Sequence, residues 1–60
     1  MNTLQENVIK AAQCSDLLLS DIREAHKAAT VENQFAEIIL MDLTAQAVEI
    51  NQKLNRLAAL

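Results

Sequence analysis

The chain of 60 residues contains no glycine and no proline, and it also has no tryptophan or tyrosine. Glycine and proline mark most tight turns and strand ends, so their absence removes the usual signals of a β fold. The only aromatic residue is Phe35, and the apolar content of 52% comes mainly from Leu, Ile, Val, Ala and Met. With the Glu, Gln and Lys residues beside them, several of these are strong helix formers. The composition therefore predicts an all-α fold.

Cysteine and histidine occur once each, as Cys14 and His26. A single cysteine cannot form a disulfide within the chain, and one Cys with one His provides too few ligands for a structural zinc site. We expect Cys14 to be a buried, unreactive thiol, because neither a cation nor a helix N-terminus is predicted beside it. We expect His26 to lie exposed near the end of a helix. No metal and no cofactor are predicted.

The length of the chain limits its stability as a monomer. A single domain of this size buries only about 60% of the surface that its unfolded form exposes. Small domains without disulfides or metals usually depend on association with another chain. We therefore expect a protein partner, either a second copy in a homodimer or a different helical protein in a hetero-complex.

Basic residues are few and scattered, and the formal net charge is −3. Binding to phosphate groups requires clustered Lys and Arg, so we expect no nucleic-acid partner. The longest apolar run, IILM at 38–41, is much shorter than the ~20 residues of a membrane span. No signal-peptide pattern opens the sequence. These features, with the unpaired thiol, predict a cytoplasmic protein without a membrane span.

The first half of the chain is predicted to form an amphipathic helix over residues 3–29. The letters TLQE at 3–6 have a capping-box pattern, in which Thr3 caps the helix and Glu6 follows three residues later. Apolar residues then recur at alternating steps of four and three, as in a helix with one buried side. The predicted core residues of this first apolar series are Leu4, Val8, Ala11, Leu18, Ile22 and Ala25, and Ser15 and Ala29 complete the series.

A second helix is predicted over residues 34–58. Its apolar residues also recur at alternating steps of four and three, and no polar residue interrupts this second apolar series. The predicted core residues here are Ala36, Leu40, Leu43, Ala47, Ile50, Leu54 and Leu57. The whole chain is thus predicted to be one helical domain.

The two series are out of phase near residues 30–33. Continued past Ala29, the first series reaches Glu32 and then Ala36, and its next member is Ile39 instead of Leu40. This mismatch favours a turn at 30–33 and an antiparallel two-helix hairpin, which completes a bundle by association with itself or another protein. One long helix in a coiled coil is the alternative. Two residues offer a mechanism for the turn. Thr30 can cap the second helix, or Asn33 can take the left-handed conformation that ends the first.

The second predicted helix, over residues 34–58, carries a further apolar stripe. Its residues are Ile38, Met41, Ala45 and Val48. A helix that is apolar on two sides is normally buried on more than one side. The stripe is therefore predicted to bind a partner, together with Phe35 and with Asp42 as a charge at the rim. It forms either the centre of a homodimeric four-helix bundle or a face for a different protein.

The sequence contains no pattern that indicates catalysis. Its carboxylates do not form the Glu-x-x-His pairs of di-iron bundles, and a phosphate-binding loop of the glycine-rich type cannot form without glycine. We predict no catalytic residues and no enzymatic activity.

The second helix resembles one helix of a known family. The letters NQF at 33–35, followed by ILMDLTAQAVEI at 39–50, are similar to the second helix of the small hairpin co-chaperones of type III secretion needle subunits. In that family a Gln–aromatic pair opens the helix, and a Leu-rich run with an acid leads to Gln-Ala and an aliphatic residue. The matching positions are Gln34, Phe35, Ile39, Leu40, Met41, Asp42, Gln46, Ala47 and Ile50. The Pro or Gly that family members often have at the turn is absent.

The resemblance implies a cytoplasmic hairpin that binds a helical-repeat chaperone and helps to keep the needle subunit from polymerising. Two other interpretations remain open. One is a homodimeric four-helix-bundle regulator, similar to the small RNA-binding hairpins of plasmids, which would require a line of basic side chains. The other is an accessory subunit of a larger complex.

Overall fold

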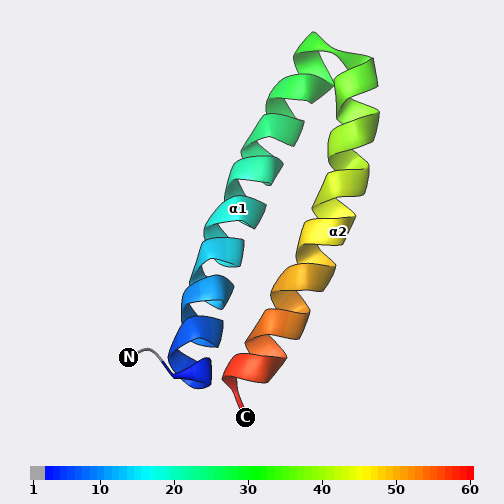
Figure 1. Ribbon diagram of the computed structural model, residues 1–60. Helices are drawn as coiled ribbons and strands as arrows, with labels where there is room; N and C mark the ends of the chain where they lie inside the picture. Colours follow the sequence, from blue (N-terminus) through cyan, green and yellow to red (C-terminus); the bar gives the residue numbers. More distant parts are fainter. Residues whose placement is uncertain (1–2) are drawn as a thin grey trace.

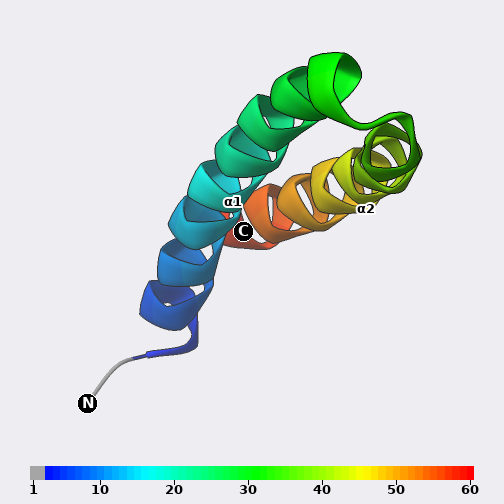
Figure 2. The same ribbon diagram turned by 90° about the horizontal axis from the view of Figure 1, so that it is seen from above.

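The computed structural model describes residues 3–60 as two antiparallel α-helices that lie side by side (Figure 1). Helix α1 spans Leu4–Glu32 and helix α2 spans Gln34–Ala58. A short link joins them at one end, as the view from above shows (Figure 2), and the start of α1 and the end of α2 lie at the other end. The hairpin measures 44 × 17 × 12 Å. The predicted all-α hairpin is confirmed, and the alternative of one continuous helix is wrong.

Helix α1 begins where the capping pattern predicts. The backbone N–H of Glu6 donates to the Thr3 hydroxyl oxygen at 3.1 Å, which satisfies one of the free donors of the first turn. The helix then continues to Glu32, past the predicted end at Ala29. Its last turn contains no basic residue, and Glu32 lies at the helix C-terminus, where the helix dipole disfavours a negative charge.

A single residue, Asn33, reverses the chain. Its backbone is extended, with φ −159° and ψ 105°, and its side-chain oxygen accepts a hydrogen bond from the Ala36 N–H at 3.1 Å. Asn33 is therefore the N-cap of α2. Its own N–H donates to the Ala29 carbonyl at 2.9 Å and ends α1. The turn is much shorter than the predicted range of 30–33.

Both predicted mechanisms for this turn are wrong. Thr30 does not cap α2, because it lies within α1 and its hydroxyl donates to the His26 carbonyl at 2.9 Å. Asn33 does not take the left-handed conformation. In a chain without glycine, an extended residue with a capping side chain joins the helices instead.

The two helices pack along an inter-helix seam. Its residues share one property: each is buried or half-buried on the side of its helix that faces the other helix, at steps of four and three. They are Val8, Ala12, Ser15, Leu19, Ile22, His26 and Ala29 of α1 and Glu37, Leu40, Thr44, Ala47, Asn51, Leu54 and Ala58 of α2. Among residues 3–60, no large side chain is fully buried. The seam is thus built mainly from small and polar side chains.

The predicted core residues agree with this seam only in part. Every second member of each predicted series lies one residue before a position that faces the other helix. Ala47 is buried, and Val8, Ala11, Ile22, Ala36, Leu40 and Leu54 are half-buried. The prediction is wrong for six residues, which are exposed: Leu4, Leu18, Ala25, Leu43, Ile50 and Leu57. At these positions the following residue turns toward the other helix, for example Leu19 after Leu18 and Asn51 after Ile50. Hydrogen bonds from Asn51 hold the helices in this rotation, as described next.

Candidate interaction surfaces

A polar cluster connects the helices near the middle of the seam. The Asn51 side-chain amide donates to the Ser15 hydroxyl at 2.8 Å and to the Asp16 carboxylate at 2.6 Å. The Ser15 hydroxyl in turn donates to the Ala12 carbonyl at 2.8 Å. Ser15 is buried, so these bonds satisfy a polar group that would otherwise be costly to bury. The cluster fixes both the rotation and the lengthwise register of the two helices.

One side of the hairpin is polar beside this cluster. An open hollow there is lined by Asp16, Leu19, Ser20, Arg23, Glu24, Lys27 and Asn51. Its two basic and two acidic side chains are mixed, and the Lys27 ammonium lies 3.5 Å from a Glu24 carboxylate oxygen, with both side chains exposed. Charges that offset one another attract ions of neither sign strongly. Within residues 3–60, no group of His, Cys, Asp and Glu side chains is arranged to hold a metal.

The other side of the hairpin is apolar and includes residues from both helices. We call it the broad face, and its residues are Leu4, Ala11, Leu18 and Ala25 of α1 and Ala36, Leu43, Ile50 and Leu57 of α2. Ala11 and Ala36 are half-buried and the other six are exposed. None of the eight is charged or polar. They are the residues of the two apolar series that the seam does not bury.

Helix geometry explains why these residues share one side. Each follows the same rule: it precedes by one residue a position that faces the other helix. One residue turns an α-helix by about 100°. Viewed along one direction, the numbering advances clockwise in α1 and anticlockwise in the antiparallel α2. A step back by one residue therefore turns toward the same side of the hairpin in both helices.

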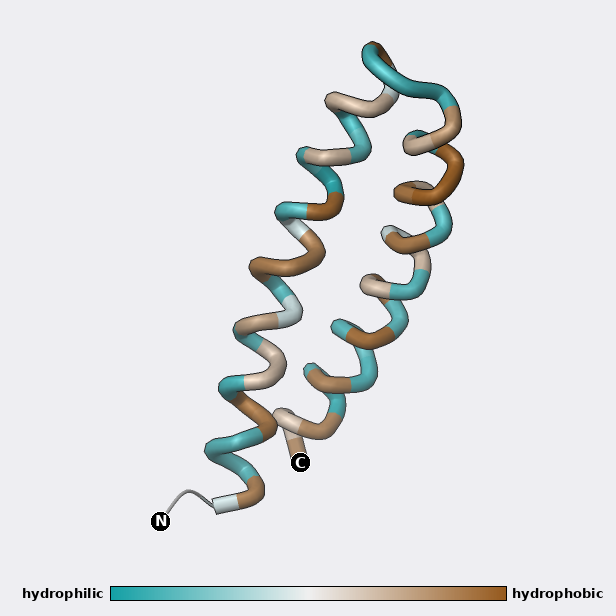
Figure 3. Tube along the Cα trace, turned by 45° about the horizontal axis from the view of Figure 1, so that its top comes forward, coloured by the Kyte–Doolittle hydropathy of each residue, from teal (hydrophilic) through white to brown (hydrophobic). Residues whose placement is uncertain are grey.

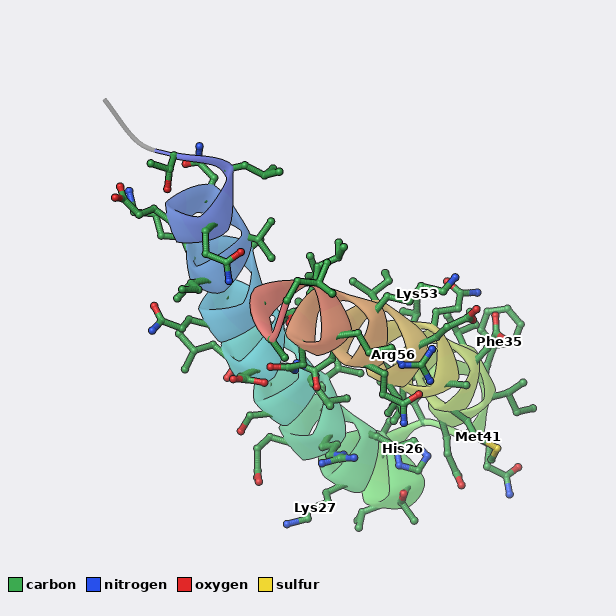
Figure 4. The ribbon with its side chains drawn as sticks, turned by 90° about the horizontal axis from the view of Figure 1, so that it is seen from below. His26, Lys27, Phe35, Met41, Lys53 and Arg56 are labelled. Atoms are coloured by element: carbon green, nitrogen blue, oxygen red, sulfur yellow. The ribbon has the colours of Figure 1, made fainter. Side chains whose placement is uncertain are left out.

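The further apolar stripe lies on the opposite side of α2 from the broad face. We call it the α2 stripe, and its residues are Ile38, Met41, Ala45 and Val48. Each of its residues follows a seam residue by one position, so it is turned the other way. Met41 and Lys53 accordingly project from opposite sides of α2 in Figure 4. Ile38 is 67% exposed and Met41 55% exposed. Ala45 is also exposed, and Val48 is half-buried.

Phe35 and Asp42 lie beside the α2 stripe. Phe35 is 75% exposed and projects from the outer edge of α2 (Figure 4). The Asp42 carboxylate is exposed and accepts a hydrogen bond from the Gln46 amide at 3.1 Å. The first turns of α2, which contain the IILM run, are also the most hydrophobic part of the chain trace in Figure 3. The six predicted partner-binding residues are thus on the surface of α2, and their binding role stays a prediction.

Two predictions about single side chains are wrong. Cys14 is exposed, because it precedes Ser15 and so points away from the inter-helix seam. His26 is half-buried, and its Nε2 atom is buried without a hydrogen-bond partner among residues 3–60. The displaced seam is the reason, since it brings position 26 toward α2 in place of Ala25.

Neither helix within residues 3–60 has a stretch long and apolar enough to cross a bilayer. Comparisons of the chain with models of protein families, with curated proteins and with solved structures found no match.

Proposed function

We propose that this chain is a non-enzymatic adapter that buries the α2 stripe against a helical protein partner. The observation that carries the proposal is the exposure of the large apolar side chains of Ile38 and Met41, on the side of α2 opposite the broad face. A contiguous apolar patch on the surface of a soluble chain indicates an interaction site or an aggregation hazard. Binding to another protein removes that hazard.

The stripe has the geometry of a helix that lies in an apolar groove. Its side chains recur at steps of three and four, which aligns them along one side of α2. Phe35 adds an aromatic anchor at the turn end, and Met41 supplies a flexible side chain that adapts to the shape of a partner. Asp42 at the rim favours a basic side chain on the partner.

The finer proposal is a cytoplasmic co-chaperone of the type III secretion kind. It is supported by the resemblance of residues 33–50 to the second helix of those co-chaperones, since the same segment supplies most of the exposed apolar surface of α2. In this proposal a helical-repeat chaperone is the partner. The RNA-binding alternative gains no support, because the basic residues Arg23 and Lys27 are accompanied by Asp16 and Glu24.

The test combines identification of the partner with a matched pair of variants. The tagged chain is used to isolate bound proteins from its source cells, and the affinity of each purified candidate is then measured by calorimetry. Ile38→Glu places a charge in the stripe, and Gln13→Glu places the same charge on an exposed position of α1. An unpaired buried charge costs several kcal/mol, so Ile38→Glu is expected to weaken binding by about 100-fold or more.

Gln13→Glu is expected to bind as the unchanged chain does. The proposal is overturned if no purified protein binds the chain directly, or if both variants bind as tightly as the original. A helical-repeat chaperone as the partner supports the finer proposal, and a partner of another kind overturns it.

A further inference from the structure

We infer that the broad face binds a second copy of this chain, so that two hairpins form an antiparallel four-helix bundle. This inference goes beyond the proposed function and concerns the opposite side of the hairpin. The α2 stripe stays accessible in such a dimer, which would present two copies of it.

The orientation of the apolar residues points to a pair of helices as the missing neighbour. In each helix the apolar series consists of seam residues and broad-face residues in alternation, such as Ile22 after Leu18 or Leu54 after Ile50. Averaged around the helix axis, the apolar side chains of each series therefore point diagonally, between the direction of the other helix and the outward direction of the broad face. Helices of a four-helix bundle direct their apolar residues in this way, because each has two neighbours. Each helix of the hairpin has only one.

The core within one hairpin is small. Its buried apolar residues are Ala12, Leu19, Ala29 and Ala47, and three of these four are alanines. Larger side chains such as Leu18 and Ile50 remain about half exposed. Covering them removes from water the apolar area that a domain of this size lacks.

The dimensions of the broad face suit a second copy. From the outline of 44 × 17 Å, the side of the hairpin that carries this face offers about 750 Å² in projection, close to the ~800 Å² that each partner contributes to a stable interface. A second hairpin has the same outline and the same uncharged face, so it covers the surface along its full length. A single helix would leave part of it exposed.

The flanks of the broad face favour one arrangement of the two copies. The flank of α1 consists of Asn7, Cys14, Asp21 and Ala28, and that of α2 consists of Ile39, Gln46, Lys53 and Leu60. One flank carries an acidic residue, Asp21, and the other a basic residue, Lys53. Packing α1 against α2 of the second copy joins unlike flanks, whereas packing α1 against α1 would bring the Asp21 side chains to the same interface. A two-fold axis parallel to the helices gives the first arrangement.

This symmetry also sets the register between the copies. A closed two-fold rotation does not shift a chain along its axis, so residues that are level within one hairpin are level between the two copies. Ser15 and Asn51 are hydrogen-bonded and therefore level. Cys14 of one copy is then expected within about one residue of the level of Lys53 of the other, on neighbouring flanks. Within one hairpin the same two residues lie on opposite outer edges.

The inference is tested first by the mass of the full chain in solution. Sedimentation equilibrium over a range of concentrations is expected to show a reversible dimer. Ile50→Glu is expected to raise the dimer dissociation constant by about 100-fold or more, because it places an unpaired charge at the centre of the interface. Ile38→Glu, the matched change on the α2 stripe, is expected to leave the dimer intact. A monomer at all concentrations, an open series of larger oligomers, or a dimer that only Ile38→Glu dissociates would each overturn the inference.

A second measurement does not require a folded monomer. Lys53→Cys, oxidised with the native Cys14 present, is expected to give covalent dimers through a disulfide between the Cys14 sulfur of one copy and the new cysteine of the other. Mapping of the disulfide by mass spectrometry identifies the pair. The absence of this link in a chain that sediments as a dimer overturns the arrangement. Failure of the dimer leaves the partner-binding test with Ile38→Glu and Gln13→Glu unaffected, so the two proposals fail separately.

Discussion

The inter-helix seam and the broad face lie on the same two helices, yet they are built from different side chains. The seam joins the helices through alanines, through larger apolar side chains such as Leu19, and through the hydrogen bonds of Ser15 and Asn51. The broad face carries larger apolar side chains, including Leu18, Leu43 and Ile50, and leaves them exposed. Small residues let helix axes approach closely, because the distance between axes depends on the side chains at the contact. In this hairpin several of the large apolar side chains of each helix therefore lie outside the side that pairs the helices.

Three consecutive leucines make this difference measurable. Leu17 is 68% exposed on the outer side of α1, Leu18 is 52% exposed on the broad face, and Leu19 is 9% exposed in the seam. The side chains are identical and the positions adjacent, so differences in their contribution to stability arise from their surroundings.

The largest effect is expected for Leu19→Ala. Truncation of a buried leucine typically costs about 2–5 kcal/mol, a large part of the stability that so small a domain can have. We expect the variant to be mostly unfolded, or to unfold at a much lower urea concentration, as followed by circular dichroism. Leu17→Ala is the matched control and should change the free energy of unfolding by less than about 0.5 kcal/mol. Equal effects at the two positions would contradict the assignment of the seam.

A smaller effect is expected for Asn51→Ala. The change removes the hydrogen bonds to Ser15 and Asp16, each contributing about 0.5–1.5 kcal/mol net, and it leaves the buried Ser15 hydroxyl without that donor. We expect a loss of about 1–3 kcal/mol in the free energy of unfolding. Asn55→Ala is the control, since the Asn55 side chain bonds only within α2, to the Asn51 carbonyl. If the control destabilises as much, the polar cluster does not hold the helices together.

The smallest of the three effects is expected for Asn33→Ala. Loss of an N-cap side chain typically costs about 1 kcal/mol, and here the Ala36 N–H loses its acceptor. Thermal unfolding of the variant should occur a few degrees lower. Asn33→Asp keeps an acceptor in the same place and should restore the stability. A variant with alanine as stable as the original would show that the cap contributes nothing.

The sequence predicted both helices, the Thr3 cap and the antiparallel arrangement, because these depend on local chemistry and on apolar periodicity. It did not predict which residues face the other helix. Apolar periodicity locates the apolar side of a helix only to within about one residue. Leu18 and Leu19 are both leucine, so either one can occupy the position that faces the other helix. The choice between them depends on tertiary contacts, such as the burial of Ala12 and Ala47 between the helices and the hydrogen bonds of Asn51.

The turn and the single cysteine show the same limit. Thr30 and Asn33 both carry an oxygen that can cap a helix, and the sequence alone does not distinguish them. The structure uses Asn33, because α1 continues as a helix through Thr30. Cys14 was expected to be buried because it lies beside the first apolar series. A helix turns by about 100° between neighbours, so Ser15 of that series can be buried while Cys14 is exposed. The α2 stripe, by contrast, lies on the surface of α2 as its spacing suggested.

The reversal at Asn33 also has a mechanical consequence. Between Leu4 and Ala58 this is the one residue outside helical conformation, so two backbone torsion angles separate the hairpin from a straight rod of about 80 Å. Two chains straightened at Asn33 can exchange arms, and the bonds from Asn51 to Ser15 and Asp16 then form between chains with the same geometry. The capping hydrogen bond from the Ala36 N–H to the Asn33 side chain stabilises the reversed conformation against the straight one. A stronger cap at Asn33 therefore makes the exchange of helices between two chains less favourable.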